Sequence, residues 1–238
     1  MGPSSTWTPI VSIAQRMGVV RQELAEACMA AGRDAHEVQL IAVSKTFPAA
    51  DIHTATLNGQ IDFGENYAQE LREKTGQLEQ ASSSPLRWHF IGRLQSNKIK
   101  HIAPFVHRIH ALESVKHAKT LARMSPEPVG CLVAVNIGRE PNKGGVLPEH
   151  ALDLCKQIVA SDTIALKGLM AIPPQCEDPE ESAPFFEEIA ALAAQGRQAG
   201  LPLSELSMGM SHDFQVAIRH GATWIRVGTA IFGQRARR

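Results

Sequence analysis

The stretch that decides the fold is LIAVSKT, residues Leu40 to Thr46. Its apolar part, Leu40 to Val43, stands between polar neighbours, which is typical of a parallel strand buried on both faces. Residues Trp7 to Ala31 precede it with apolar side chains at helical spacing, and Gly32 is placed to end that helix. The N-terminal region therefore predicts one helix followed by one buried strand.

The same alternation of a short apolar run and a longer amphipathic stretch continues along the chain. Helical periodicity is clear in Glu149 to Ala160 and in Pro184 to Ala199. After Leu40 to Val43, the remaining predicted strands are Ile61 to Gly64, Trp88 to Ile91, Arg108 to Leu112, Gly130 to Ile137, Leu166 to Met170, Glu205 to Met208 and Thr223 to Val227. Eight such units without a linker predict an α/β fold, a closed (β/α)8 TIM barrel with an additional N-terminal helix, rather than a doubly wound sheet. We expect residues 1–238 to form a single domain.

Composition excludes several classes of protein. The 238 residues carry 24 Lys plus Arg against 24 Asp plus Glu, and only 5% are aromatic. This balance argues against a dedicated nucleic-acid binder, which needs basic groups for phosphates and rings for bases. The four cysteines form no CxxC pair and the histidines show no metal-ligand spacing, so we expect no metal site and a reducing, cytoplasmic location. No apolar run approaches the roughly 18 to 20 residues that span a bilayer, so we expect no membrane partner.

In a barrel of this kind, functional groups follow the carboxyl ends of the strands, and phosphate commonly binds after strands seven and eight. The seventh predicted strand ends in SMGMSHD, residues 207–213, where Ser211 is placed to cap a helix. The eighth ends in RVGTA, residues 226–230, where Gly228 allows close approach of the backbone and Thr229 opens a helix. Each alone is an ordinary capped turn, but together they predict a phosphate cradle.

Lys45 directly follows the first buried strand and lies at the same end of the predicted barrel. Desolvation there would favour a neutral amine that can form a Schiff base with an aldehyde. The alternative is a lysine that extends from the strand end into water. A Schiff-base lysine across from a phosphate cradle indicates an aldehyde that carries a phosphate, and pyridoxal 5′-phosphate fits this description.

Arg226 stands two residues before Gly228, so strand alternation predicts that both face the barrel interior. A guanidinium beside the pyridine nitrogen of that cofactor would oppose protonation of the ring and leave it a weak electron sink. Alternatively, Arg226 pairs with an acid on the barrel floor. We interpret His89, on the third predicted strand, as a core histidine hydrogen-bonded to a backbone carbonyl.

Five stretches of the chain are similar to one known family. They are AVSK (residues 42–45), FGENY (63–67), WHFIGRLQSNK (88–98), SMGMSHD (207–213) and RVGTAIFG (226–233). In this order, and over nearly the whole chain, they resemble the pyridoxal phosphate homeostasis proteins, which are single-domain relatives of the alanine racemase barrel.

The resemblance implies a role for each matching residue. It implies that Lys45 holds pyridoxal 5′-phosphate as a lysine aldimine and that Arg226 faces the pyridine nitrogen. It further implies phosphate contacts by Ser207, Ser211, Gly228 and Thr229, and a lining of the cofactor by Asn66 and Met208. The implied function is cofactor homeostasis or delivery without catalysis, with apo forms of pyridoxal-phosphate-dependent enzymes as partners. We expect a monomer, because a closed barrel leaves no open sheet edge.

Two enzymatic interpretations stay open. An amino-acid racemase, or another enzyme that uses this cofactor, needs a second acid or base opposite Lys45. By resemblance, alanine racemases bring a tyrosine from an additional domain of the partner subunit, whereas the only tyrosine here is Tyr67. A Schiff-base aldolase for a phosphorylated sugar would share the lysine and the cradle, with Glu65 available as its acid.

Overall fold

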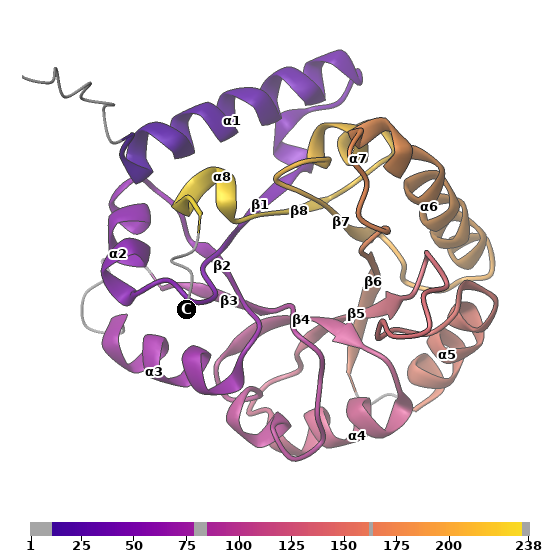
Figure 1. The fold of residues 1–238 in the computed structure, drawn as a ribbon. Helices are drawn as coiled ribbons and strands as arrows, with labels where there is room; N and C mark the ends of the chain where they lie inside the picture. Colours follow the sequence, from indigo (N-terminus) through magenta and orange to yellow (C-terminus); the bar gives the residue numbers. More distant parts are fainter. Residues whose placement is uncertain (1–10, 79–84, 162–163, 235–238) are drawn as a thin grey trace, which may run out of the picture.

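The computed structural model describes residues 11–78, 85–161 and 164–234. Within them, eight parallel strands follow one another in chain order around a closed barrel, and the last pairs with the first. The strands are β1 (Gln39–Val43), β2 (Asp62–Glu65), β3 (Arg87–Phe90), β4 (Val106–Leu112), β5 (Gly130–Val135), β6 (Ala165–Ala171), β7 (Glu205–Met210) and β8 (Trp224–Val227). Figure 1 shows this ring of strands with the helices around its outside. The predicted barrel is confirmed.

The helices cover the outside of the barrel. They are α1 (Ile13–Ala30), α2 (Ala49–Leu57), α3 (Ala68–Leu78), α4 (Val115–Met124), α5 (Pro148–Ala160), α6 (Ala183–Gln198), α7 (Phe214–Arg219) and α8 (Thr229–Phe232), with short 3-10 turns at η1 (Ala35–Glu37), η2 (Ile99–His101) and η3 (Pro179–Ser182). In the described ranges, no helix combines the length and the apolar character that crossing a membrane requires.

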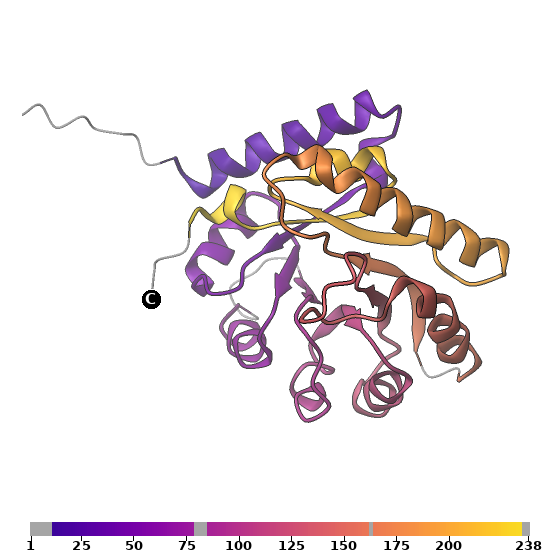
Figure 2. The same ribbon diagram turned by 45° about the vertical axis from the view of Figure 1, so that its right-hand side comes forward.

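The additional N-terminal helix is present as α1. Ser12 begins it with a capping box: its hydroxyl accepts from the Gln15 amide, and the Gln15 side chain accepts from the Ser12 amide. Gly32, at φ +64°, follows its end as predicted. The predicted start of the helix, residues 7–10, lies outside the described residues. Figure 2 shows α1 along the outside of the barrel, where it contacts α7 and α8.

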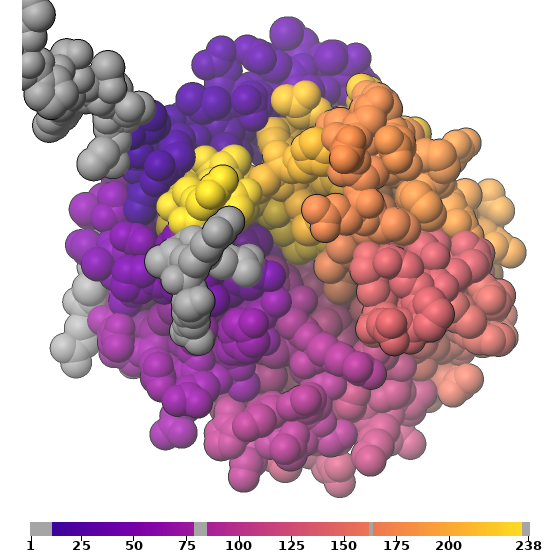
Figure 3. Space-filling model, viewed as in Figure 1, coloured from indigo at the N-terminus to yellow at the C-terminus, as the bar shows by residue number. Residues whose placement is uncertain are grey.

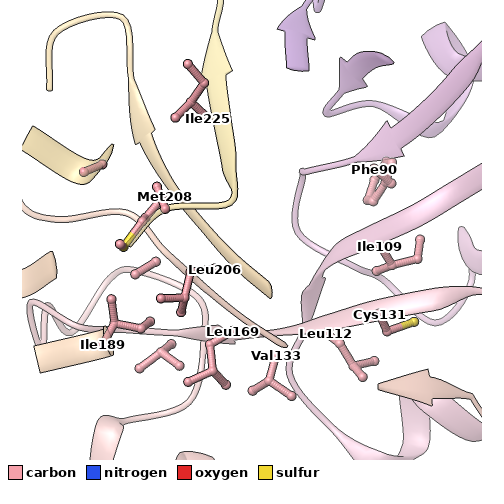
Figure 4. Close-up of a cluster of buried hydrophobic side chains, with 14 of the residues drawn as sticks. Phe90, Ile109, Leu112, Cys131, Val133, Leu169, Ile189, Leu206, Met208 and Ile225 are labelled. Atoms are coloured by element: carbon pink, nitrogen blue, oxygen red, sulfur yellow. The ribbon is translucent and has the colours of Figure 1, made fainter. Parts of the chain in front are cut away.

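Strand alternation divides the buried side chains into two layers. Outward-facing residues such as Phe90, Leu169 and Met208 pack between the barrel wall and the helices (Figure 4). Burial of each such side chain contributes about 1.5–3 kcal/mol. The barrel interior instead combines small apolar clusters with buried polar groups, among them His89 and His110. These polar groups lie inside the barrel, and one of their neighbours, Arg226, reaches the cavity at the carboxyl ends of the strands.

The closing seam of the barrel brings the first and the last strand together. Ala42 of β1 is in register with Val227 of β8, so Lys45 and Gly228 follow neighbouring strands. In the space-filling view of Figure 3, the yellow residues near the end of the described chain lie against the indigo and purple residues of the first barrel units. A Cβ atom on Gly228 would lie 3.3 Å from the Val43 carbonyl oxygen, so this position favours glycine.

Candidate functional site

A cavity of about 990 Å³ opens where the strands end. Six of the eight predicted cofactor-binding residues line it: Lys45, Asn66, Ser211, Arg226, Gly228 and Thr229. The loops after β5 and β6 complete the wall, with residues 140, 143 and 172–177. The structure therefore brings most of the predicted site residues, from β1, β2, β7 and β8, around one hollow.

The residues on both sides of Lys45 are held by carboxylates, Ser44 through its hydroxyl and Thr46 through its backbone amide. The Ser44 hydroxyl donates to Glu65 Oε1 at 2.7 Å, and the Thr46 amide donates to Glu70 Oε2 at 2.8 Å. Thr46 has φ +69°, a left-handed conformation that costs a non-glycine residue about 1–2 kcal/mol. The half-buried Lys45 thus follows a strand whose end is fixed in an unusual turn.

Lys74 on α3 joins these two carboxylates. Its Nζ donates to Glu65 Oε1 at 2.7 Å, to Glu70 Oε2 at 3.0 Å and to the Ser44 carbonyl at 2.9 Å. Burial raises the pKa of Glu65 more than the neighbouring Lys74 lowers it. We call Ser44, Glu65, Glu70 and Lys74 the outer clamp, because they lie between the barrel wall and α3.

A second buried network crosses the barrel interior. Asp62 Oδ1 lies 2.8 Å from His89 Nε2, His89 Nδ1 lies 2.9 Å from His110 Nε2, and His110 Nδ1 lies 2.8 Å from Ser207 Oγ. Arg226 Nη1 donates to the same Ser207 oxygen at 2.6 Å. We call these five residues the inner relay. His89 is a buried core histidine as predicted, but side chains rather than a backbone carbonyl satisfy it.

Arg226 ends the inner relay at the cavity wall. It also donates to the Ala171 carbonyl at 3.0 Å, and within the described residues no carboxylate forms an ion pair with it. Burial lowers the pKa of Arg226 to about 10, which still leaves it charged near neutral pH, and the charge of Asp213 opposes that shift. The alternative of a pairing with a floor acid is therefore wrong: the acid of the relay, Asp62, is reached only through three intervening side chains.

Ser207 and Met208 do not line the cavity. Both side chains are fully buried; the Ser207 hydroxyl belongs to the inner relay, and Met208 packs in the outer hydrophobic layer (Figure 4). Adjacent strand residues face opposite sides of the wall, and neither of these two reaches the mouth. Contrary to expectation, neither side chain lines the cavity, although Ser207 lies directly behind Arg226, which does.

Two backbone amides converge where the phosphate cradle was predicted. The Gly228 amide donates to Ser211 Oγ at 3.2 Å, and the Ala230 amide points to the same oxygen at 3.5 Å. Ser211 does not cap a helix as expected, because α7 begins at Phe214 with Asp213 as its N-cap residue. Instead, Ser211 joins the end of β7 to the first turn of α8, so donors from two units meet at one side of the cavity.

Fold and cavity define a class of protein, the barrel of the alanine racemase N-terminal domain, whose family model matches residues 29–236. A pyridoxal phosphate homeostasis protein of Pseudomonas aeruginosa is 41% identical over 94% of this chain and 96% of its own. The structure of PipY from Synechococcus elongatus PCC7942 without pyridoxal phosphate has a TM-score of 0.82 at 36% identity, covering 93% of this chain and 100% of PipY. With pyridoxal phosphate bound, PipY gives 0.80 at 35% identity and the same coverage. The chain therefore belongs to the family of pyridoxal phosphate homeostasis proteins.

The residues on which the enzymatic alternatives depend lie elsewhere. Tyr67 is 53% exposed and lines a neighbouring cavity of about 950 Å³, not the one that contains Lys45. Glu65 is fully buried, faces α3 and is held by Lys74 and Ser44. Neither residue lines the cavity that contains Lys45.

Proposed function

We propose that the protein binds pyridoxal 5′-phosphate through one site and takes part in the intracellular homeostasis or delivery of this cofactor without catalysis. The observation that carries the proposal is the single cavity onto which Lys45, Arg226 and the turn at Gly228 all open. An amine, a guanidinium and converging amides match an aldehyde, a pyridine nitrogen and a phosphate. The relatives named as homeostasis proteins, and PipY with its bound pyridoxal phosphate, support the same conclusion.

Each residue has a defined task in this proposal. Pyridoxal phosphate supplies an aldehyde that reacts reversibly with primary amines, and Lys45 is the amine in the cavity wall. The amides of Gly228 and Ala230, together with the Ser211 and Thr229 hydroxyls, donate to the phosphate. Arg226 faces the ring nitrogen as a donor and holds it unprotonated.

Three other acidic or basic groups of the wall, Glu140, His212 and Asp213, are engaged in contacts within the protein, which supports a non-catalytic role. Glu140 forms an ion pair with Lys143, the Asp213 carboxylate accepts from the Met210 amide at 2.6 Å, and the His212 ring contacts the Glu177 carbonyl at 2.9 Å. Proton exchange at an amino-acid α-carbon needs a positioned acid or base besides the lysine. These three groups are each held by a partner within the protein.

The first experiment locates the cofactor. Purified protein is incubated with pyridoxal phosphate, reduced with borohydride and mapped by peptide mass spectrometry. We expect a yellow complex and a reduced adduct on Lys45, with Lys45→Ala losing both while remaining folded. Lys143→Ala, from the same cavity, is the matched control and should keep the Lys45 adduct. A wild-type adduct found mainly on another lysine would contradict the assignment.

The second experiment separates a carrier from an enzyme. Loaded protein is offered L-amino acids while chirality, keto acids and amines are followed, and an apoenzyme that requires pyridoxal phosphate is offered in parallel. We expect activation of the apoenzyme, which is the proposed partner, and no amino-acid product beyond the amount of protein. Sustained product in excess would instead establish a racemase or another enzyme that uses this cofactor. Sedimentation of the loaded protein tests the proposed monomer.

A further inference from the structure

The inner relay connects the barrel floor to the wall of the cavity through an unbroken series of buried side chains. Asp62, His89, His110, Ser207 and Arg226 are each no more than 4% exposed. The donor to acceptor distances of the series lie between 2.6 and 2.9 Å. The mechanism proposed above uses only the last member, Arg226, so the other four need an explanation of their own.

The charge states of Asp62 and Arg226, at the two ends of the relay, determine which atom carries the proton in each hydrogen bond between them. Burial raises the pKa of Asp62, but donors from His89 and Arg87 and their charges bring it below its ordinary value, so Asp62 is a carboxylate. His89 must therefore present Nε2–H to it. Burial lowers the pKa of both histidines, which leaves each ring neutral with one donor and one acceptor.

The assignment then propagates along the relay. With its proton on Nε2, His89 accepts at Nδ1, so His110 donates from Nε2 and accepts at Nδ1. The Ser207 hydroxyl must give its proton to His110, which leaves its oxygen lone pairs for the Arg226 guanidinium. The reverse arrangement would place a bare nitrogen against a carboxylate. All hydrogen bonds therefore point from Arg226 toward Asp62.

We propose that Asp62, His89, His110 and Ser207 are positioning residues that hold Arg226 in one orientation through a relay with a single tautomeric state. A hydroxyl alone can rotate and present either its proton or its lone pairs. His110 removes that freedom by accepting the hydroxyl proton, so toward Arg226 the Ser207 oxygen acts only as an acceptor. The neutral rings also separate Asp62 from Arg226. The positive charge that Arg226 presents at the cavity is therefore not neutralised by a directly paired carboxylate.

Imidazole nitrogen shifts in ¹⁵N NMR of the full chain test the tautomers directly, before any cofactor is added. We expect both His89 and His110 as the neutral Nε2–H form at pH 7.5. Either ring in the Nδ1–H or doubly protonated form would overturn the relay. This measurement needs no bound cofactor, so its outcome is separate from that of the proposed function.

The positioning role is tested with Ser207→Ala, which removes the hydroxyl and leaves little space. We expect a shift of the His110 Nδ1 resonance, a faster-rotating Arg226 guanidinium and about tenfold weaker binding of pyridoxal phosphate, the loss of one charge-assisted hydrogen bond. His110→Gln serves as a second variant, and His36→Gln, on an exposed turn, as the control. Unchanged guanidinium dynamics and unchanged affinity in folded Ser207→Ala would overturn the proposal.

Discussion

The outer clamp and the inner relay lie on opposite sides of the same barrel wall and arrange their charged groups in opposite ways. β2 contributes to both: Asp62 faces the interior and Glu65 faces α3. In the clamp, the Lys74 ammonium touches two carboxylates directly, and these contacts fix the turn at Lys45. In the relay, two neutral rings keep a carboxylate away from a guanidinium. Direct contact between charges makes the clamp rigid. Separation of Asp62 from Arg226 leaves the positive charge of Arg226 available to a ligand.

The largest effect should follow from breaking the clamp on one side only. Lys74→Met leaves the fully buried Glu65 without its ammonium, and removal of one partner of a buried pair costs about 3–5 kcal/mol. Denaturant unfolding measures this loss, and the double variant Glu65→Gln with Lys74→Met should recover most of it. Lys156→Met, which removes an exposed pair with Asp153, should cost less than about 1 kcal/mol. Equal losses in the two single variants would show that the clamp is not a buried pair in solution.

The relay should make the protein sensitive to acid. His89 and His110 are neutral in the fold because burial lowers their pKa, while in the unfolded chain they take protons below about pH 6.5. Their contribution to the free energy of unfolding is therefore fully present above that pH and is lost as the pH falls toward the lowered pKa of the folded state. The slope for each histidine is at most about 1.4 kcal/mol per pH unit. Unfolding free energies from pH 7 to 5 measure the slope.

His110→Gln separates this effect from other titrations. Glu65, whose pKa is raised by burial, works in the opposite direction at lower pH, because the folded protein binds its proton more readily than the unfolded chain. The variant should have a slope smaller by at most about 1.4 kcal/mol per pH unit and keep the Glu65 contribution. An unchanged slope would mean that His110 is already protonated or becomes exposed.

The smallest effect concerns the turn that the clamp holds. Thr46 has a left-handed backbone, which glycine adopts without the Cβ penalty. Because glycine also loses more entropy on folding, Thr46→Gly should stabilise the protein by only about 0.5 kcal/mol. Thermal unfolding measures this, with Thr54→Gly inside α2 as a control that should destabilise by about 0.5–1 kcal/mol. A loss of stability in Thr46→Gly would show that the clamp does not impose this conformation.

Local patterns predicted much of the fold and part of the site. Short apolar runs found all eight strands, and the rule that barrel function follows strand ends indicated Lys45 and Gly228. The two-residue alternation of a strand correctly predicted that Arg226 faces the barrel interior. Each of these inferences needs only neighbours along the chain and a general property of parallel barrels.

The two networks depend on contacts between distant strands and were not predicted. His89 meets His110 across a strand pair whose register shifts beside His89, and β4 has a second irregularity between Ile109 and Leu112. Such register shifts change which side chains become neighbours, and no short stretch of sequence indicates where they occur. The i,i+4 spacing of Glu70 and Lys74 was a visible signal of one contact in the clamp. Nothing in that spacing indicates that Lys74 also contacts Glu65. For Ser211, both it and Asp213 suit a helix cap, and only the position of β8 distinguishes them.

The seam between β1 and β8 has a consequence for synthesis. Lys45 leaves the ribosome well before Arg226, Gly228 and Thr229, because translation follows the order of the sequence. Closing so long a loop requires the last strand to dock beside the first, and a nascent chain that ends before Trp224 has the amine but no cradle. On the proposed function, a chain that has not yet formed β8 lacks the groups that would hold the phosphate and the ring nitrogen.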